Sequence, residues 1–474
     1  GLNELNAHEA AQKIRDHEIT SEALVQDCLD RIADSEQQVH AWQYLDNAAA
    51  LDQARTRDTT PVRGLLHGVP VGIKDLINTG DMPTCYGSSI YAGHRPASDA
   101  ECVKRLREAG AVILGKTVTT EFAAFNPALT RNPHNLSRTP GGSSSGSAAA
   151  VADGMVPLAL GTQTAGSVIR PAAFCGVVGM KPTYGRVSRW GLVAFASSLD
   201  QIGPMTRSVA DCADALNVIS NHDHRDSTSV PAPFADFGHD LEAGVSGMNI
   251  GVPSEYLVDG IEPGVRSAFE ASLKTLEDLG ANISETFLPL TDHALAVYYI
   301  IAPSEASANL SRYDGVKYGL GSTDSKTSAE ATESARADGF GEEVKRRILL
   351  GTYALSAGYH DAYYKKAQQV RTLIRREFTD AFLKFDALVT PTSPGVAFKI
   401  GDKTDDPFRM YMNDVCTIPV NIAGLPAISI PGGMSESLPV GLQFIGPQFG
   451  DTVIIQAAAA YERATTWHTE HPPV

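Results

Sequence analysis

Short apolar runs alternate with stretches of helical pattern along most of this chain, and this alternation limits its fold more than any other feature. Apolar runs of about four to eight residues between turn-formers are typical of buried strands. Such runs are GVPVGIKD (68–75), AVILGK (111–116), MNIGVP (248–253), ALVTP (387–391), AISIP (427–431) and PVGLQFIG (439–446). Helical patterns cover 99–109, 265–279, 342–355 and 451–464. The alternation predicts an α/β protein with a largely parallel or mixed sheet.

The first sixty residues are expected to be helical. Thr20 is a suitable N-cap. The apolar residues after it recur on one helical face: Leu24, Val25, Cys28, Leu29 and Ile32. Two polar segments, 221–243 and 321–338, are expected to be surface excursions. We find no internal repeat.

The charge and cysteine content exclude several classes of protein. The chain has 39 Lys and Arg against 55 Asp and Glu, a net charge of −16, which argues against a mainly nucleic-acid-binding role. Its six cysteines form no CxxC pair and have no zinc-type spacing, so we expect reduced thiols in a cytoplasmic protein, without a metal site. We see no signal-peptide pattern, and the longest apolar stretch, 295–303, is too short to cross a bilayer.

A serine- and glycine-rich centre is the most informative stretch. It reads TPGGSSSGSAAAVADG (139–154) and runs directly into a helical pattern, so its backbone N–H groups can approach a ligand. Three alternatives remain open. The segment could be a flexible linker, it could be a GxSxG nucleophile elbow with Ser144 as nucleophile, or it could be a phosphate-binding loop, although GxxxxGK[ST] is absent.

A second stretch, GTQTAGSVIRPAAFCGVVGMKPTYG (161–185), carries its own chemistry. The small residues Thr164, Ala165, Gly166 and Ser167 can direct consecutive N–H groups at an oxyanion, and Ser167 can attack the carbonyl held there. No histidine is close enough in sequence to serve as its base. Lys74, at the end of an apolar run, is the candidate base, since a buried lysine loses pKa and can then accept a proton.

The plainer interpretation of Lys74 is a surface lysine paired with Asp75. This alternative stays open at this stage, because sequence alone does not decide whether the end of the apolar run is buried.

Lys74, GGSSSGS and TAGS together resemble the amidase signature family. Ser143 follows Lys74 by 69 residues and Ser167 follows Ser143 by 24, which matches the family pattern. The resemblance implies the amidase signature fold, an α/β fold with a mixed central sheet flanked by helices on both faces. It also implies that Lys74 is the base, that Ser143, held by a cis peptide bond, is the bridging serine, and that Ser167 is the nucleophile. The oxyanion would be held by the backbone of 164–167, with no metal and no cofactor.

The sequence departs from the family pattern near the nucleophile. The family usually has Asp where Gln163 stands, Gly at Ala165 and Arg at Ile169, whereas here Arg170 follows one position later. We interpret this as a subgroup variant, because the three triad positions are intact. If the usual Asp and Arg pair, their joint loss leaves no unpaired charge.

The C-terminal half resembles the A subunits of bacterial glutamyl-tRNA amidotransferases. The segments that carry this resemblance are 184–204, 305–319, 339–374 and KTDDPFRMYMNDVCTIPVNIAGLP (403–426). In those subunits an Arg and an Asp hold the amino-acid end of glutamine, and the matching residues are Arg347 and Asp414. For each, the alternative is an ordinary ion pair. The N-terminal half, including LHGVPVGIKDLINT, resembles free-standing amidases instead.

These observations lead to one main hypothesis and two alternatives. The main hypothesis is a free-standing cytoplasmic serine amidohydrolase that cleaves small carboxamides through an acyl-enzyme on Ser167. Its chemistry would extend to anilides, esters and carbamates, with neither nucleic acid nor membrane as partner. The first alternative is a glutaminase of the A type that passes ammonia to B and C subunits, and the second is a non-catalytic binding protein. We expect a single domain over 1–474, with a helical region (1–60), a catalytic core (61–220) and a C-terminal half (221–474) that completes the sheet and pocket. Self-association is compatible with each hypothesis.

Overall fold

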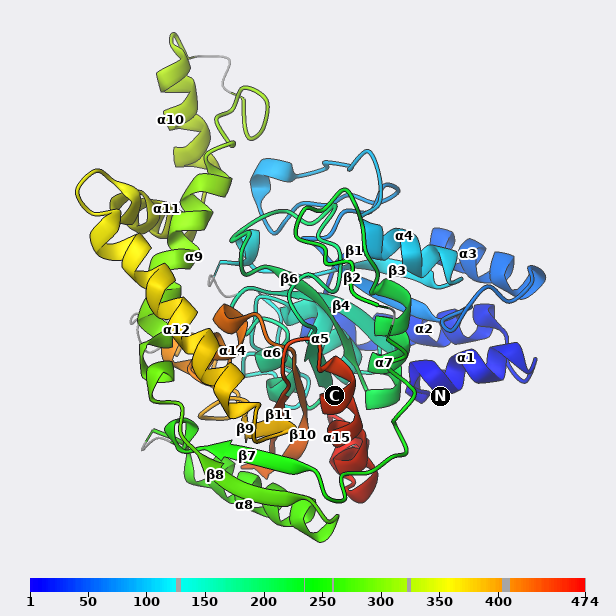
Figure 1. The fold of residues 1–474 in the computed structure, drawn as a ribbon. Coiled ribbons are helices and arrows are strands. Elements are labelled where there is room, and N and C mark those ends of the chain that lie inside the picture. Colours follow the sequence, from blue (N-terminus) through cyan, green and yellow to red (C-terminus); the bar gives the residue numbers. More distant parts are fainter. Residues whose placement is uncertain (125–128, 234, 258–259, 322–324, 403–409, 474) are drawn as a thin grey trace.

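A computed structural model describes residues 1–124, 129–233, 235–257, 260–321, 325–402 and 410–473. Within these ranges eleven strands form one mixed sheet (Figure 1). The strands are β1 (Trp42–Leu45), β2 (Pro70–Lys74), β3 (Val112–Thr117), β4 (Leu158–Gln163), β5 (Val178–Lys181), β6 (Gln201–Thr206), β7 (Asn249–Pro253), β8 (Asn282–Thr286), β9 (Ala387–Pro391), β10 (Ala427–Ser435) and β11 (Leu438–Ile445). Their order across the sheet is β1-β3-β2-β4-β6-β5-β10-β11-β9-β7-β8.

Helices cover this sheet and extend beyond it at one side. They are α1 (Ala7–Arg15), α2 (Ser21–Val39), α3 (Asn47–Thr59), α4 (Glu101–Glu108), α5 (Ser145–Ala152), α6 (Ile169–Cys175), α7 (Val209–Ile219), α8 (Pro263–Asp278), α9 (Ala294–Leu310), α10 (Ser328–Gly339), α11 (Glu342–Leu355), α12 (Lys366–Ala381), α14 (Ile418–Ala423) and α15 (Asp451–Ala464). In Figure 1, α9, α10, α11 and α12 lie to the left of the sheet and α10 projects from the body.

Parallel pairing places the ends of two strands at one edge of the sheet. β2 lies between β3 and β4 and is parallel to both, with Ile73 opposite Leu160 on β4. The carboxyl ends of β2 and β4 therefore meet at the same edge, the edge at which open α/β sheets bind their ligands. These ends carry Lys74 and Gln163, and the predicted nucleophile turn follows Gln163 directly.

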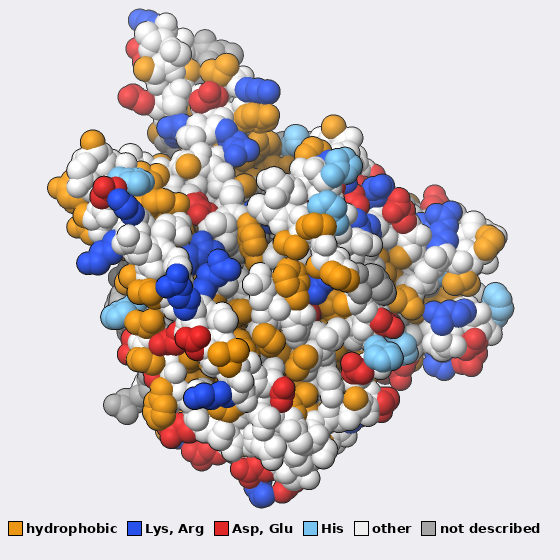
Figure 2. All heavy atoms as spheres, viewed as in Figure 1, with side chains coloured by type: hydrophobic (Ala, Val, Ile, Leu, Met, Phe, Trp, Pro, Cys, Tyr) orange, Lys and Arg blue, Asp and Glu red, His pale blue; other side chains and the backbone are white. Residues whose placement is uncertain are grey.

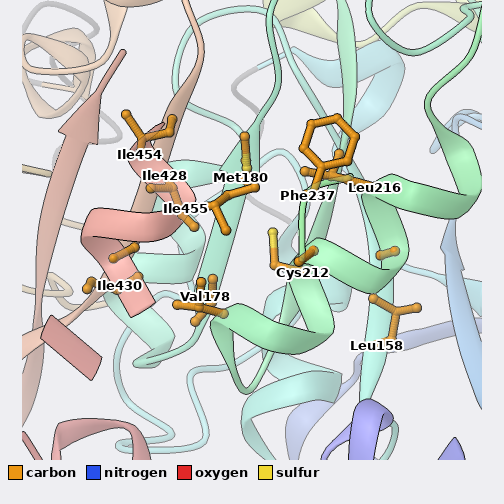
Figure 3. Packing of buried hydrophobic residues seen from close by; sticks show 14 of the residues in the cluster. Leu158, Val178, Met180, Cys212, Leu216, Phe237, Ile428, Ile430, Ile454 and Ile455 are labelled. Atoms are coloured by element: carbon orange, nitrogen blue, oxygen red, sulfur yellow. The ribbon is translucent and has the colours of Figure 1, made fainter. Parts of the chain in front are cut away.

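Both faces of the sheet are covered, as the resemblance implies. On β4, Leu158 and Leu160 face one core, whereas Ala159 faces the other, the alternation expected of a strand buried on both sides. Figure 3 shows the first core, where α7 and α15 bring Cys212, Leu216, Ile454 and Ile455 onto strand residues such as Val178 and Ile428. The second core contains side chains of α2, α5 and α6.

Most of the predicted elements are confirmed, but the region expected to be helical, 1–60, also contains the edge strand β1, which pairs with β3. Thr20 caps α2, where its side chain accepts a hydrogen bond from Ala23 N–H, and the predicted apolar face is buried. The described part of the polar segment 321–338 lies at the surface, as predicted, but most of it belongs to α10 (Figure 1). Thr327 caps this helix by accepting from Glu330 N–H, a local signal that the composition of the segment obscures. Residues 322–324, and the part 403–409 of the C-terminal segment singled out above, lie outside the described residues.

The charges at the surface and the state of the cysteines agree with what the composition predicts. On the face shown in Figure 2, acidic side chains are spread among basic ones. All six cysteines are free. Of the helices described, none combines the length and the apolar character needed to cross a membrane.

The start of α5 lies directly against backbone at the end of β3, and this contact requires a glycine. Gly146 N–H donates to the carbonyl of Val118 at 3.1 Å. A Cβ on Gly146 would lie less than 3.0 Å from both the Ala41 carbonyl oxygen and the Val118 nitrogen, which are backbone atoms that cannot turn aside. This contact fixes the segment that carries Ser143.

Gly146→Ala should therefore destabilise the protein by about 1–3 kcal/mol or more, the usual range for forcing atoms into a packed site. The measurement is the free energy of unfolding from a denaturant titration. Gly260→Ala is the control, since a Cβ there meets nothing within 4 Å, and it should change the stability by less than about 0.5 kcal/mol. Equal stabilities of the two variants would contradict this account of α5.

Candidate active site

Lys74 is the last residue of β2, and its side chain is fully buried. Its Nζ lies within hydrogen-bond distance of three hydroxyls: Ser143 Oγ at 2.7 Å, Thr162 Oγ1 at 2.8 Å and Ser144 Oγ at 2.9 Å. It also donates to the carbonyl oxygen of Thr162 at 3.3 Å. Because β4 is parallel to β2, the sheet itself brings Thr162 to the lysine.

These contacts suit a neutral amine. An ammonium group offers three hydrogens and accepts nothing, whereas a neutral amine donates two and accepts one. Hydroxyls can donate as well as accept, so the Lys74 network satisfies the neutral form. Burial lowers the pKa of Lys74 well below its usual value of 10.5, and the charge of Asp200 opposes that shift in part. Among the described residues, no carboxylate hydrogen-bonds to Lys74 Nζ.

The plainer interpretation, a surface lysine paired with Asp75, is wrong. The Asp75 carboxylate instead lies 3.6 Å from Nζ of Lys116 and accepts from the N–H of Cys85 at 3.0 Å. Asp75 lies in the turn that follows β2, where its carboxylate has partners other than Lys74.

Ser143 follows a cis peptide bond from Gly142, as the resemblance implies. Only 3% of Ser143 is exposed, and its hydroxyl is the nearest partner of Lys74. The next residue, Ser144, donates its backbone N–H to the carbonyl of Ser167 at 3.3 Å. The structure therefore links the segment of Ser143 to the turn of Ser167.

The linker and nucleophile-elbow interpretations of this segment are wrong. The residues from Ser143 into α5 are buried, unlike those of a flexible linker. An elbow needs a strand before its serine, and residues 139–144 form none. Ser144 Oγ already has hydrogen-bond partners on β4. It donates to the carbonyl of Thr162 and accepts from the Thr162 N–H, each at 3.2 Å.

Ser167 lies in the turn between β4 and α6, together with Thr164, Ala165 and Gly166. Within the described residues, the N–H groups of Ala165, Gly166 and Ser167 donate to no backbone acceptor. Free donors at consecutive positions are what an oxyanion requires. Ser167 is 6% exposed, so the turn is nearly closed to solvent.

Gln163 explains how the turn is held without the usual family Asp. Its Oε1 accepts from the N–H groups of Val168 at 2.9 Å and Ile169 at 3.0 Å. Its Nε2 donates to the carbonyl of Ala165 at 3.0 Å. One neutral amide thus joins the turn to the start of α6, so this departure from the family pattern leaves no unpaired charge.

Two further residues fix the turn from a distance, and the sequence interpretation missed both. Thr164 Oγ1 donates to Asp200 Oδ1 at 2.7 Å, and Asn421 Nδ2 donates to the Thr164 carbonyl. Burial raises the pKa of Asp200 to about 6, although the hydrogen bond from Thr164 opposes the rise. These contacts span 36 and 257 residues, and no local spacing signals them.

Asp414, in a short 3-10 helix (Met412–Asp414), lies against the nucleophile turn. A Cβ on Gly166 would fall less than 3.0 Å from Asp414 Oδ1, so the carboxylate occupies the space that this glycine leaves open. Arg170 Nη1 donates to Asp414 Oδ2 at 2.8 Å. Burial raises the pKa of Asp414, whereas the charges of Arg170 and Arg347 lower it.

Arg347, on α11, is 1% exposed and is held mostly by aromatic rings. Its guanidinium carbon lies 5.0 Å from the ring centre of Tyr299 and 5.2 Å from that of Tyr411. Its Nε donates to Glu343 Oε1 at 2.8 Å. Arg347 and Asp414 therefore both have internal partners, and each acts on the electrostatics of the other. In the described ranges, no group of three or more His, Cys, Asp or Glu side chains is placed to hold a metal ion.

Comparisons with known proteins agree on the family. The model of the Amidase family matches residues 23–455. The A subunit of the glutamyl-tRNA(Gln) amidotransferase of Chloroflexus aggregans is 52% identical over 465 residues, covering 96% of this chain and 95% of that protein. The crystal structure of the corresponding protein from Thermotoga maritima shares 44% identity at a TM-score of 0.81, covering 98% of this chain and 95% of that one. Peptide amidase from Stenotrophomonas maltophilia shares 32% at a TM-score of 0.83, covering 99% and 98%.

The main hypothesis, a free-standing amidohydrolase, is wrong. Relatives identical at about half of their positions over nearly the full chain are named as amidotransferase A subunits, whereas the peptide amidase is more distant. The N-terminal motifs misled because they build the sheet edge around Lys74, which belongs to a fold that both groups share over nearly the full chain. With the fold, the hydroxyl-bound lysine and the full-length match in agreement, the chain belongs to the amidase signature family, whose enzymes act on carbon–nitrogen bonds.

Proposed function

We propose that this chain is the glutaminase component of a glutamyl-tRNA(Gln) amidotransferase. It would hydrolyse the side-chain amide of glutamine and release ammonia for partner subunits to use on charged tRNA. The observation that carries the proposal is a buried, hydroxyl-bound Lys74 next to Ser143, beside a turn against which the Asp414 carboxylate lies. The names of the full-length relatives support glutamine as the substrate.

The chemistry proceeds through an acyl-enzyme. Ser167 Oγ attacks the amide carbon while its proton passes to Ser143 Oγ, whose own proton passes to neutral Lys74. The N–H groups of the 164–167 turn stabilise the oxyanion. The same path returns a proton to the leaving nitrogen, so ammonia departs and Ser167 carries a glutamyl ester. Water then attacks the ester and releases glutamate.

Two charged side chains suit the amino-acid end of glutamine. Asp414 can accept from the α-ammonium through Oδ1, since Arg170 occupies Oδ2 and a carboxylate has about four acceptor positions. The planar guanidinium of Arg347 has the geometry to hold the α-carboxylate with two parallel N–H donors.

Partners of the B and C type would receive the ammonia and contact the tRNA, since the net charge of −16 disfavours direct tRNA binding by this chain. Free cysteines fit a reducing cytoplasm.

The triad assignment predicts the effects of three substitutions. Ser167→Ala should lower kcat by about 10⁴-fold or more, and Lys74→Ala and Ser143→Ala by about 10²–10⁴-fold each. Because the three act as a unit, a double variant should be little worse than the more impaired of its two single variants. Ser145→Ala is the control, because its buried hydroxyl has no protein partner among the described residues, and it should keep its activity. Near-normal turnover by Ser167→Ala would overturn the mechanism.

A pH profile tests the role of Lys74 as base. Lysine accepts a proton only when neutral, so kcat/KM should rise with pH through the pKa of Lys74 and level off above it. Because burial lowers that pKa, the plateau should be reached well below pH 10.5. The measurement is kcat/KM for a neutral amide across the pH range in which the protein stays folded. An activity that falls as pH rises toward neutrality would contradict a lysine base.

Glutamine recognition predicts a split between substrates. Arg347→Ala and Asp414→Ala each remove one partner of a buried charge pair, a loss of about 2–5 kcal/mol in binding. Both should raise the KM for glutamine steeply, and neither should raise the KM for a neutral anilide, which lacks the two charges. The measurement is kcat/KM for glutamine and one anilide in wild type and both variants. Equal losses on the two substrates would defeat this assignment.

A further inference from the structure

Arg170 is a buried cation that joins two parts of the site which lie far apart in sequence. It is 3% exposed and stands three residues after Ser167, on α6. Its Nη1 donates to Asp414 Oδ2 at 2.8 Å, and its Nη2 donates to the carbonyl oxygen of Gly142 at 2.7 Å. A single planar guanidinium therefore bridges the segment of Ser143 and the carboxylate beside the nucleophile turn.

The contact with Gly142 bears on Ser143. The Gly142 carbonyl belongs to the planar peptide unit whose nitrogen is that of Ser143, so holding this oxygen fixes the plane from which the serine projects. On its other side, the Ser143 carbonyl accepts from the N–H of Thr120 at 3.3 Å. With both carbonyls held, Ser143 Oγ lies 2.7 Å from Lys74 Nζ.

The contact between Arg170 and Asp414 affects the part of the site that would bind the amino group of the substrate. Asp414 is fully buried, and its other oxygen lies against Gly166 and 3.4 Å from Thr417 Oγ1. Arg170 forms an ion pair with this carboxylate, so it holds the carboxylate in position and opposes the rise in its pKa that burial causes.

The register of α6 explains why position 170 can do this. Successive helical residues point about 100° apart, so an arginine at 169, the position usual in the family, would face another direction. Here Ile169 is fully buried in an apolar cluster. Arg170 faces Gly142 and Asp414 instead.

We propose that Arg170 is a positioning residue that holds Ser143 and Asp414 as one unit, and so couples recognition of the substrate amino group to the proton relay. The proposal rests on the proposed function. Arg170 acts through these two residues and does not contact the reacting atoms. A lysine cannot replace it, because an ammonium group on a flexible stem lacks the paired, coplanar N–H groups that reach both acceptors.

The proposal predicts separate effects on two substrates. In Arg170→Gln, the loss of the Gly142 contact should lower kcat for glutamine and for a neutral anilide by about 10²-fold, the usual effect of misplacing a catalytic group by about 1 Å. The loss of the Asp414 contact should in addition raise the KM for glutamine only. Arg170→Lys keeps a cation near Asp414, so it should lose kcat as Arg170→Gln does but retain more of the affinity for glutamine.

The pH dependence gives a readout that loss of packing would not move. The titratable and charged groups that act on or respond to Asp414 are Arg170, Arg347, Tyr298, Tyr299 and Cys416. Removing Arg170 removes an opposing cation, so the pKa of Asp414 rises and the ionised form that binds an ammonium needs a higher pH. The acid limb of kcat/KM should therefore move to higher pH for glutamine and stay in place for the anilide.

The experiment uses the full chain, with active sites counted by a serine-reactive fluorophosphonate so that kcat refers to folded sites. Arg186→Gln is the matched control. Arg186 is also buried, donates to a carbonyl (Pro233, 3.3 Å) and lies 3.5 Å from a buried carboxylate (Asp451), but it touches neither Ser143 nor Asp414. It should keep the wild-type kcat per titrated site.

Wild-type kcat per titrated site in Arg170→Gln on both substrates would overturn the proposal, even if its melting temperature falls as in Arg186→Gln. Should Arg170→Gln fail to fold, Arg170→Lys decides by the same comparison. If Arg170→Gln lost activity on glutamine alone, the claim that Arg170 positions Ser143 would be overturned. If the ratio of kcat/KM for glutamine to kcat/KM for the anilide stayed unchanged, the claim that Arg170 positions Asp414 would be overturned. If the proposed function is wrong, the wild-type protein will not hydrolyse glutamine. Hydrolysis of the anilide would still show whether Arg170 positions Ser143.

Discussion

The burial of one amino group, that of Lys74, is the constraint on which the rest of the site depends. A charged ammonium without a carboxylate partner is costly inside a protein, so this position favours the neutral amine. Such an amine needs acceptors for its two hydrogens and one donor for its lone pair, and the hydroxyls of Ser143, Ser144 and Thr162 can play either part. The parallel pairing of β2 and β4 provides one of them, and the close contact of α5 with β3 fixes the others. The pairing of the strands therefore determines which hydroxyls surround Lys74 and could exchange protons with it.

The part of the site around Asp414 and Arg347 follows the opposite electrostatic rule. There the buried charged groups have partners: Asp414 has Arg170, and Arg347 has Glu343 and two tyrosine rings. An amine whose pKa is lowered by burial and two ion-paired side chains thus lie in one buried region. Environments that shift the pKa values of neighbouring groups apart are typical of sites that transfer protons.

The sequence predicts elements whose periodicity agrees with their environment. β9, α11 and α15 begin and end at the residues that their patterns indicate. β6 was missed because Gly203 and Pro204 usually interrupt strands, yet it lies within the sheet, where a Cβ on Gly203 would meet the backbone of Met180. The triad positions could be found because their residues lie in motifs. Arg170 and Asp414 form an ion pair although they lie 244 residues apart, and the sequence around neither residue indicates that the other is its partner.

That separation has a consequence for synthesis of the protein. At about 5–20 residues per second, a ribosome needs about 12–50 seconds after Arg170 to reach Asp414. Throughout this interval the nascent chain holds Lys74, Ser143 and Ser167 but lacks the anion that Arg170 requires in order to be buried. The buried ion pair beside the nucleophile turn therefore cannot form until nearly all of the polypeptide exists, so this part of the site is completed late in synthesis.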